Sequence, residues 1–313
     1  MAEKIATRES YGNALVEFAP DYDFVVLDAD LAAATKTGIF KKKYPERFFN
    51  CGIAEGNMIS VAAGIAATGK TVFASSFAMF AAGRAFEQIR NSVGYPHLNV
   101  KICATHAGIS VGEDGATHQC LEDIALMRTI PGMVVINPAD DVEAKAAIKA
   151  ALDYNGPMYI RLGRLAVPVY NDPATYKFEL GKGICLKEGT DVTIVATGLM
   201  VDIANNAANA LAEQGINARV INIHTIKPLD KDIILKAAKE TGAIVVAEEH
   251  NVIGGLGSAV TEAVCESFPV PVLRVGTNDV FGRSGKVPPL LQMYGLTAEN
   301  IAEKAKLAIA MKK

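Results

Sequence analysis

A single acidic residue stands at the start of an apolar segment. Glu55, in the sequence CGIAEGNMIS, is followed by a run from Met58 to Ile65 in which almost every residue is apolar. A helix that is apolar on all faces is buried, so we expect a buried helix with Glu55 in its first turn. Acidic side chains favour the positive end of a helix dipole, which is a purely structural role. A carboxyl group among apolar side chains also favours its protonated form and can share a proton with a nitrogen heterocycle. The position alone leaves both interpretations open.

The longest polar loop, THAGISVGEDGATHQ (residues 105–119), brings histidines and acids close together. Glycines let its backbone approach a ligand, and two histidines with an intervening acid suit hydroxyl recognition and proton transfer near neutral pH. Their spacings match no zinc-ligand pattern. A loop rich in Gly and Asp is also typical of a simple turn. The clustering favours function, with His106, Asp114 and His118 as its residues.

Aromatic and basic residues stand near two other strand ends. Phe77 and Phe80 lie three apart in SSFAMFAAGR, a spacing that is common in protein cores. Arg8, Arg161 and Arg164 have the side chain that best matches a phosphate group, although most arginines lie on the surface. The last two directly follow a predicted strand in MYIRLGR.

Strand and helix patterns alternate along the chain and would position these residues. Predicted strands cover residues 23–30, 70–76, 100–108, 133–140 and 158–163, with helices beginning near residues 10, 55, 78, 121 and 140. After a stretch rich in Pro and Gly, strands are predicted at 191–198, 217–228, 243–250 and 271–277. Alternation of this kind predicts parallel βαβ units. We therefore expect two doubly wound α/β domains, residues 1–167 and 189–313, joined by a linker at 168–188.

Ligands of open parallel sheets bind beyond the carboxyl ends of the strands. Most of the candidate residues named so far stand at the ends of predicted strands. Asp30, in DAD, stands at the end of another one. In the second half, GGLGSAV only partly matches a dinucleotide-binding loop, because Val260 replaces its third glycine. The first domain is therefore expected to carry the site.

Composition excludes several other classes of function. The chain is 50% hydrophobic and has a net charge of -3 without long blocks of like charge, so neither nucleic acid nor a membrane surface is an expected partner. No apolar run approaches the roughly 18 residues of a membrane span, and MAEKIATRES lacks the apolar core of a secretory signal. We expect a cytoplasmic protein.

In their order and spacing, these segments resemble the C-terminal half of transketolase, as found in split transketolases made of two chains. The stretch ATHAGISVGEDGATHQCLEDIALMRTIPGMVVINPAD is similar to the family signature ATHDSIGVGEDGPTHQ and to the family segment directly after it. GIAEGNM is similar to the segment around the family's glutamate, and RLGR to the strand end that binds the substrate phosphate. The resemblance covers essentially the whole chain. It implies a pyrimidine-binding domain followed by a transketolase C-terminal domain.

The resemblance implies a cofactor, thiamine diphosphate, and a reaction. A two-carbon ketol unit would pass from a ketose phosphate to an aldose phosphate, as in the pentose phosphate pathway. Glu55 would hydrogen-bond the N1′ nitrogen of the aminopyrimidine ring, which explains apolar surroundings for this carboxyl group. Phe77 and Phe80 would pack on that ring, and Asp30 would lie near the thiazolium. His118 would be catalytic, because it could stabilise the oxyanion that develops on the substrate.

The resemblance also implies how the substrate is held. Arg8, His106 and Arg164 match residues that bind the terminal phosphate, and Asp114 matches a residue that contacts a sugar hydroxyl. Arg161 has no counterpart and is left out of the predicted site.

Four positions depart from the family pattern: Ala34, Gly56, Gly83 and Ala107. They stand where the family commonly has a serine, a histidine, an aromatic residue and an acid. The phosphate contact at residue 34 would then be weaker, or Lys36 or Thr37 would supply it. These departures affect the preferred substrate rather than the cofactor chemistry.

A partner chain is implied by what the sequence lacks. The family holds the diphosphate through Mg²⁺ or Ca²⁺ bound by a GDG segment and a downstream asparagine, and the similar string here, residues 113–115, already belongs to the polar loop. An N-terminal transketolase subunit would supply that domain and the metal, in an α2β2 assembly. The second domain would then mainly extend the dimer interface.

Three alternatives share part of this pattern. Half of a 1-deoxyxylulose-5-phosphate synthase and the β subunit of a 2-oxoacid dehydrogenase have the same layout, but the full GEDGATHQ loop with upstream His106 favours transketolase. A non-catalytic regulatory homologue would keep the fold without the chemistry. The presence of Glu55, Asp114 and His118 argues against it.

Overall fold

Seven strands form the sheet of the first domain, in the order β12-β6-β7-β5-β4-β2-β3. The computed structural model describes residues 3–312. Except for β12, the strands of this sheet run parallel. The strands are β2 (Phe24–Asp28), β3 (Phe48–Asn50), β4 (Thr71–Phe77), β5 (Val100–Thr105), β6 (Val134–Ile136), β7 (Met158–Arg161) and β12 (Thr225–Lys227). The central strands are buried on both faces, which explains their continuous apolar runs.

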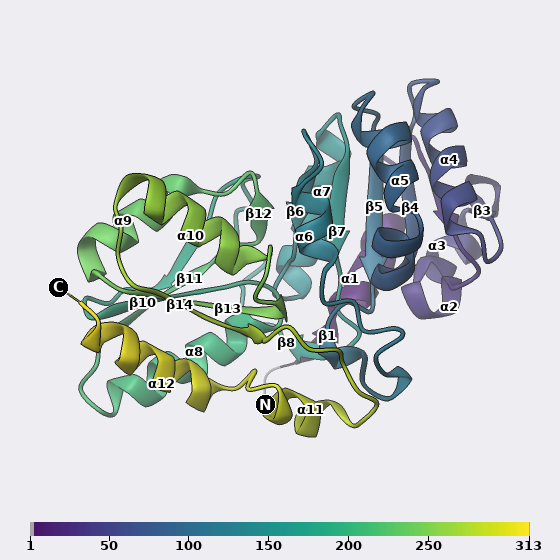
Figure 1. The fold of residues 1–313 in the computed structure, drawn as a ribbon. Helices are drawn as coiled ribbons and strands as arrows, with labels where there is room; N and C mark the ends of the chain where they lie inside the picture. The colour runs from purple at the N-terminus through teal and green to yellow at the C-terminus, as the bar shows by residue number, and fades with distance from the viewer. Residues whose placement is uncertain (1–2, 313) are drawn as a thin grey trace.

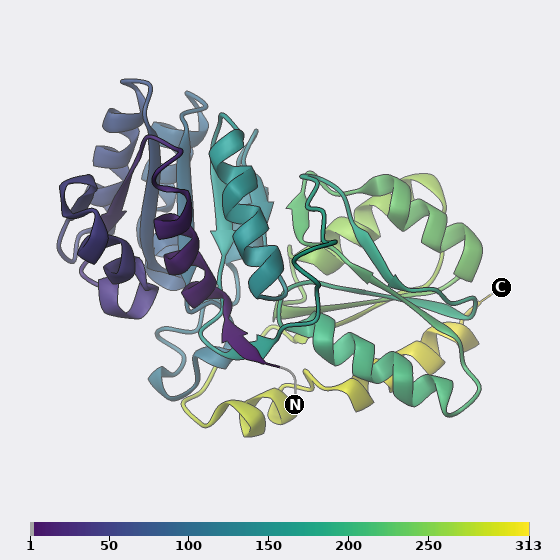
Figure 2. The ribbon, with the colours of Figure 1, turned by 180° about the vertical axis from the view of Figure 1, so that it is seen from behind.

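Helices cover both faces of this sheet. On one face, α1 packs against α7 and α3 (Figure 2). On the other face, α4 packs against β4 and against the irregular helical segment that follows β4, which comprises η2, α5 and η3 (Figure 1). The elements are α1 (Thr7–Phe18), α2 (Ala32–Thr35), α3 (Thr37–Lys43), η1 (Pro45–Arg47), α4 (Glu55–Ala66), η2 (Met79–Arg84), α5 (Phe86–Gln88), η3 (Ile89–Gly94), η4 (Ile109–Asp114), α6 (Asp123–Arg128) and α7 (Asp141–Asp153). A two-stranded pair, β1 (Lys4–Ala6) with β8 (Ala166–Pro168), joins the two ends of this domain.

The second domain is a five-stranded sheet of order β14-β13-β10-β11-β9 between two layers of helices. In Figure 1, α9 and α10 lie on one face of the sheet and α8 and α12 on the other. The elements are β9 (Ile184–Lys187), β10 (Val192–Ala196), α8 (Met200–Ala212), β11 (Ala218–Asn222), α9 (Lys231–Thr241), β13 (Ile244–Asn251), α10 (Leu256–Ser267), β14 (Val272–Thr277), α11 (Val287–Met293) and α12 (Ala298–Ala310). The predicted fold class, two mainly parallel α/β domains, is confirmed.

Three local features differ from the sequence-based expectations. The strand predicted at 217–228 is two strands, and the second, β12, pairs antiparallel with β6 of the first sheet. Strand β9 lies inside the range predicted as a linker and pairs with β11. The prediction that α4 is buried on all faces is wrong: Asn57, Ser60, Val61 and Gly64 form an exposed stripe at helical spacing.

Residues 3–312 contain no helix that is both long and apolar enough to cross a membrane.

Candidate active site

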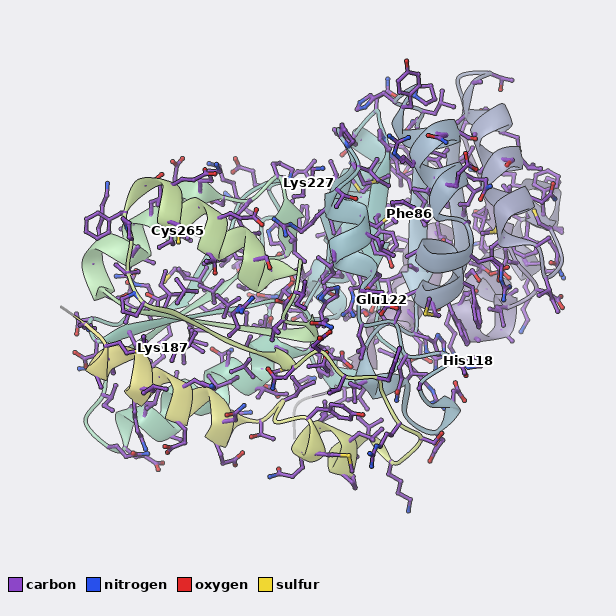
Figure 3. The ribbon with its side chains drawn as sticks, in the orientation of Figure 1. Phe86, His118, Glu122, Lys187, Lys227 and Cys265 are labelled. Carbon is purple, nitrogen blue, oxygen red and sulfur yellow. The ribbon has the colours of Figure 1, made fainter. Side chains whose placement is uncertain are left out.

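Site residues gather at the carboxyl ends of β2, β4, β5 and β7, which are neighbours in the first sheet. Two of them have left-handed backbone conformations, with φ of 64° at Asp30 and 56° at His106. Such backbone strain in non-glycine residues clusters at functional sites. The polar loop of residues 107–120, here called the site loop, is closed at its base by a bridge between Ala107 and Cys120. Figure 3 shows His118 on this loop, at the end of the first domain.

Glu55 is buried at the first position of α4, as the sequence predicts, but it faces a cation. Its carboxylate, 1% exposed, accepts hydrogen bonds from Ser76 Oγ at 3.3 Å and from Arg84 Nη1 at 2.7 Å. Arg84 is half exposed and also lies over the Phe80 ring, 4.9 Å from its centroid. The carboxylate and the guanidinium form an ion pair. Sequence reasoning missed Arg84, although its place four residues after Phe80 puts both on one side of a helix.

The aromatic residues form a stacked series with the two histidines. Phe77 and Phe80 have ring centroids 6.0 Å apart and planes 12° from parallel. His106 stacks on Phe77 at 3.8 Å, and His118 meets Phe80 edge-on at 5.2 Å. Phe80 lies on η2, a π-helical segment of a kind found frequently at functional sites. We call Glu55, Phe77, Phe80 and Arg84 the cofactor end of the site, after the ligand that the family resemblance implies there.

Basic groups meet at the opposite side of His106. Arg8 donates through Nη1 to the carbonyl oxygen of Ala34 at 2.8 Å and lies 3.3 Å from His106 Nε2. Arg164 donates to the carbonyl oxygen of Val111, and its charge acts on both Arg8 and His106. The buried Nε of Arg8 has no hydrogen-bond partner within residues 3–312. We call Arg8, His106 and Arg164 the cation end of the site.

Electrostatics keep His106 neutral. Burial, and then the charges of Arg8 and Arg164, lower the pKa of His106 to about 3. Because an arginine only donates hydrogen bonds, Nε2 of His106 accepts from Arg8, and Nδ1–H donates to Thr105 Oγ1 at 2.9 Å. Burial also lowers the pKa of Arg8 itself. An anion placed here would offset the repulsion among these groups.

Two predicted site residues stand apart from these contacts. The Asp30 carboxylate accepts a hydrogen bond from Asn50 Nδ2 at 2.9 Å, and its backbone N–H donates to Asn50 Oδ1 at 3.1 Å. Asp114 is exposed at the end of η4, on the site loop. Among residues 3–312, neither carboxylate forms a hydrogen bond or ion pair with the two ends of the site.

Arg161, which the sequence analysis left out, is a buried structural residue. Its Nε donates to Asp123 Oδ2 at 2.8 Å, and Tyr159 donates to the same oxygen at 2.8 Å. The signal was available in the sequence, because a charged residue inside a buried strand needs a partner.

No group of three or more His, Cys, Asp or Glu side chains that could hold a metal ion occurs within residues 3–312.

The fold and the site together define a two-domain, mainly parallel α/β protein with an acidic, aromatic and cationic site at the strand ends of its first domain. A model of the transketolase pyrimidine-binding domain matches residues 3–169, and one of the transketolase C-terminal domain matches residues 181–301. The chain belongs to the transketolase family and corresponds to its C-terminal section.

Relatives of about the same length support this assignment. A putative transketolase C-terminal section from Methanocaldococcus jannaschii is 52% identical over 95% of this chain and 94% of its own length. A 6-deoxy-6-sulfo-D-fructose transketolase subunit from Clostridium sp. is 47% identical over 95% and 92%. A solved structure of a split gene transketolase, an inactive β4 tetramer, superposes with a TM-score of 0.92 at 52% identity and covers 99% of this chain and 100% of that one.

Proposed function

We propose that this chain is the C-terminal subunit of a thiamine-diphosphate-dependent transketolase, which transfers a two-carbon ketol unit from a ketose phosphate to an aldose phosphate in the cytoplasm. The observation that carries the proposal is one continuous series of contacts. It runs from the Glu55 carboxylate through Arg84, Phe80, Phe77 and His106 to Arg8, and His118 meets this series at Phe80. A proton-handling group, an aromatic surface and an anion-binding cluster are thus aligned in the order that such a transfer needs.

The residues of the cofactor end fit the aminopyrimidine ring. Glu55 would hold its nitrogen, Phe77 and Phe80 would pack on it, and Asp30 would approach the thiazolium. The bound cofactor supplies an electron sink for the two-carbon unit, and the protein supplies orientation and proton management. In this role Glu55 must exchange its hydrogen bond with Arg84 for one with the ring.

His118 and the cation end act on the substrate. The His118 ring, edge-on to Phe80, can donate a hydrogen bond to an oxygen that gains negative charge during transfer. Asp114, on the same loop, would accept from a sugar hydroxyl. Arg8 and Arg164 would bind the terminal anion, because each guanidinium still has free N–H groups for a bidentate contact. Neutral His106, whose Nε2 accepts from Arg8, would line the same anion site.

The terminal anion is expected to be a phosphate, with a sulfonate as the second candidate. The relative named for a sulfonated ketose is 47% identical to this chain, and both groups present oxygens that a guanidinium binds. The Ala34 carbonyl already occupies one N–H of Arg8, whereas a serine there would have offered a hydroxyl donor. Lys36, paired with Glu9 at 3.0 Å, is close enough for its charge to help to lower the pKa of His106, and it can assist in binding the anion.

The proposal requires a partner chain that binds the diphosphate through Mg²⁺ or Ca²⁺, within an α2β2 assembly. The solved relative without activity contains β chains in its tetramer. In this chain, three apolar side chains on the segments before and after Glu55 are exposed, with Ile53 at 78%, Phe49 at 46% and Val61 at 40%. A partner chain that covers this region would bury them.

The deciding experiment is mild purification of the tagged chain from its native host, followed by mass spectrometry and a transfer assay. We expect a stoichiometric partner with a GDG segment, and transfer from phosphate-ended ketoses that depends on both chains and on thiamine diphosphate. Parallel assays with sulfonate-ended ketoses and with pyruvate test the alternatives. Activity with pyruvate as donor would favour the synthase. No cofactor-dependent turnover with any partner would favour the regulatory homologue.

A further inference from the structure

Glu249 reaches from the second domain into the site loop. It lies on β13 and is almost fully buried, and its Oε1 accepts a hydrogen bond of 2.5 Å from the backbone N–H of Ser110. The same carboxylate packs on Gly108, where a Cβ atom would lie 2.4 Å from it. Gly108 also has a φ of +82°, so both its conformation and its missing side chain suit this contact. The start of the site loop is therefore shaped around a carboxylate of the other domain.

The end of the site loop is tied to the same residue. Arg161 donates through Nη2 to the carbonyl oxygen of Glu249 at 2.9 Å and to that of Cys120 at 3.4 Å. Because Arg161 also pairs with Asp123, this buried guanidinium links the loop end, the first domain and β13. Glu249 of the second domain is thus bonded to the start of the loop directly and linked to its end through Arg161.

The tip of the second domain supports the loop from the other side. Gln119 Nε2 donates to the carbonyl oxygen of Arg283 at 2.9 Å, and a Cβ atom on Gly115 would lie 2.2 Å from Ser284 Oγ. In Figures 1 and 2 the segment before α11 runs beside the site loop. These contacts go beyond the expected role of the second domain as an extension of the dimer interface.

The position of the site loop matters because two predicted site residues depend on it. His118 stands near its end, and Arg164 is bonded to its Val111 carbonyl oxygen. A shift of the loop would move both residues. The cofactor end would stay in place, because it comes from α4, β4 and η2.

We propose that Glu249 is a positioning residue for the transfer reaction: by holding the Ser110 amide it fixes the site loop, and so sets where His118 and Arg164 meet the substrate. The inference rests on the proposed function, since it assigns Glu249 a part in the same reaction. It differs from a merely structural role, in which Glu249 would only stabilise the contact between the domains.

Glu248 is a matched control for Glu249. The two residues are neighbours on β13 and point to opposite sides of the strand. The Glu248 carboxylate, 1% exposed, accepts hydrogen bonds from the backbone N–H groups of Leu256 and Gly257 at 2.7 Å and 2.8 Å. Both glutamates are buried and bonded to backbone amides, but these bonds of Glu248 stay within the second domain.

The test compares Glu249→Ala, Glu249→Gln and Glu248→Ala by two independent measurements. Hydrogen exchange, read by mass spectrometry on this chain alone, reports on the amides of residues 106–120. Steady-state kinetics with the N-terminal subunit, using xylulose 5-phosphate and ribose 5-phosphate, report kcat and KM, while calorimetry gives the cofactor Kd.

We expect Glu249→Ala to speed exchange of the Ser110 amide at least tenfold, roughly what loss of one buried charged hydrogen bond produces. It should also lower kcat/KM for the ketose by about 10- to 100-fold, as small misplacements do, without changing the cofactor Kd. Glu249→Gln should restore both values, because its carbonyl oxygen still accepts from Ser110. Glu248→Ala should lower thermal stability and leave loop exchange and kcat/KM unchanged.

Three results would overturn the proposal: unchanged exchange in Glu249→Ala, an equal loss of kcat/KM in Glu249→Gln, or the same loss in Glu248→Ala. If Glu249→Ala does not fold, Glu249→Asp keeps the charge but withdraws it by one methylene, and must show the same pattern. If the wild-type pair transfers no ketol unit, the proposed function fails, whereas exchange still decides whether Glu249 holds the loop.

Discussion

The two ends of the candidate site are built in different ways. At the cation end, His106 is 3% exposed, Arg8 is tied to a backbone carbonyl, and Arg164 is bonded to the site loop. At the cofactor end, the Arg84 side chain is 52% exposed and Ile53 is 78% exposed beside Glu55. This chain thus organises the cation end with its own buried contacts. Its cofactor end stays more exposed, which fits the partner chain that we propose.

The strongest test of the cofactor end is Glu55→Gln. The amide cannot share a proton with a ring nitrogen as a carboxyl group does, so kcat should fall by about 10²- to 10⁴-fold, the usual value of proton transfer in catalysis. Turnover would be measured with the partner chain and saturating cofactor. Thermal stability within a few degrees of wild type serves as the control, and a variant with the wild-type rate would remove the role assigned to Glu55.

At the cation end, Arg164→Ala should mainly raise KM for anionic ketoses. A hydrogen bond to a charged group contributes about 1.5–3 kcal/mol, so we expect a 10- to 100-fold rise. The effect falls on KM because the anion is bound alike in the ground and transition states. Arg164→Lys keeps the charge but not the bidentate geometry and should lie between the two. Unchanged KM values in both variants would mean that the anion is held elsewhere.

Burial of neutral His106 predicts a pH effect on stability. Its pKa is lowered to about 3 in the folded chain, so the unfolded chain binds the extra proton between roughly pH 6.5 and 3. The stabilising contribution is therefore complete above pH 6.5 and is lost as the pH falls. Between pH 7 and pH 5, wild type should lose about 2 kcal/mol more of its free energy of unfolding than His106→Gln. Parallel pH dependences in urea unfolding would contradict this.

The smallest expected effect concerns Arg84. Its half-exposed ion pair with Glu55 must break when the cofactor ring binds, and such pairs contribute at most about 1 kcal/mol. Arg84→Met should therefore tighten the cofactor Kd of the assembled enzyme by up to about fivefold. Calorimetry would measure it, with the exposed Arg90→Met as control. Weaker binding would show that Arg84 helps to hold the cofactor instead.

Local patterns predicted the fold class. Strand ends could be located because β-branched runs alternate with helices, and this placed Asp30, Phe77 and His106 at one edge of a sheet. The prediction that α4 is buried on all faces was wrong, because small residues such as Ser60 and Gly64 fit a buried face and an exposed face of a helix equally well. Which of the two applies depends on neighbours that the sequence of one helix does not name.

Long-range partners could not be read from local patterns. The contacts of Glu55 with Arg84 and of Ser110 with Glu249 join residues 29 and 139 positions apart. Periodicity reports which side of an element is apolar, but it does not report which distant side chain meets a given polar group. Hence the partners of Arg161 were not predicted, although a guanidinium in a buried strand needs a hydrogen-bonding partner.

Strand β12 links the two domains more tightly than a linker does. Its chain segment comes from the second domain, yet it completes the edge of the first sheet, where Thr225 pairs with Ile136. A fragment that stops before it would leave β6 as an open edge, ready to pair with other chains. The two domains should therefore melt in a single cooperative transition, and a gene divided between them would yield pieces that aggregate.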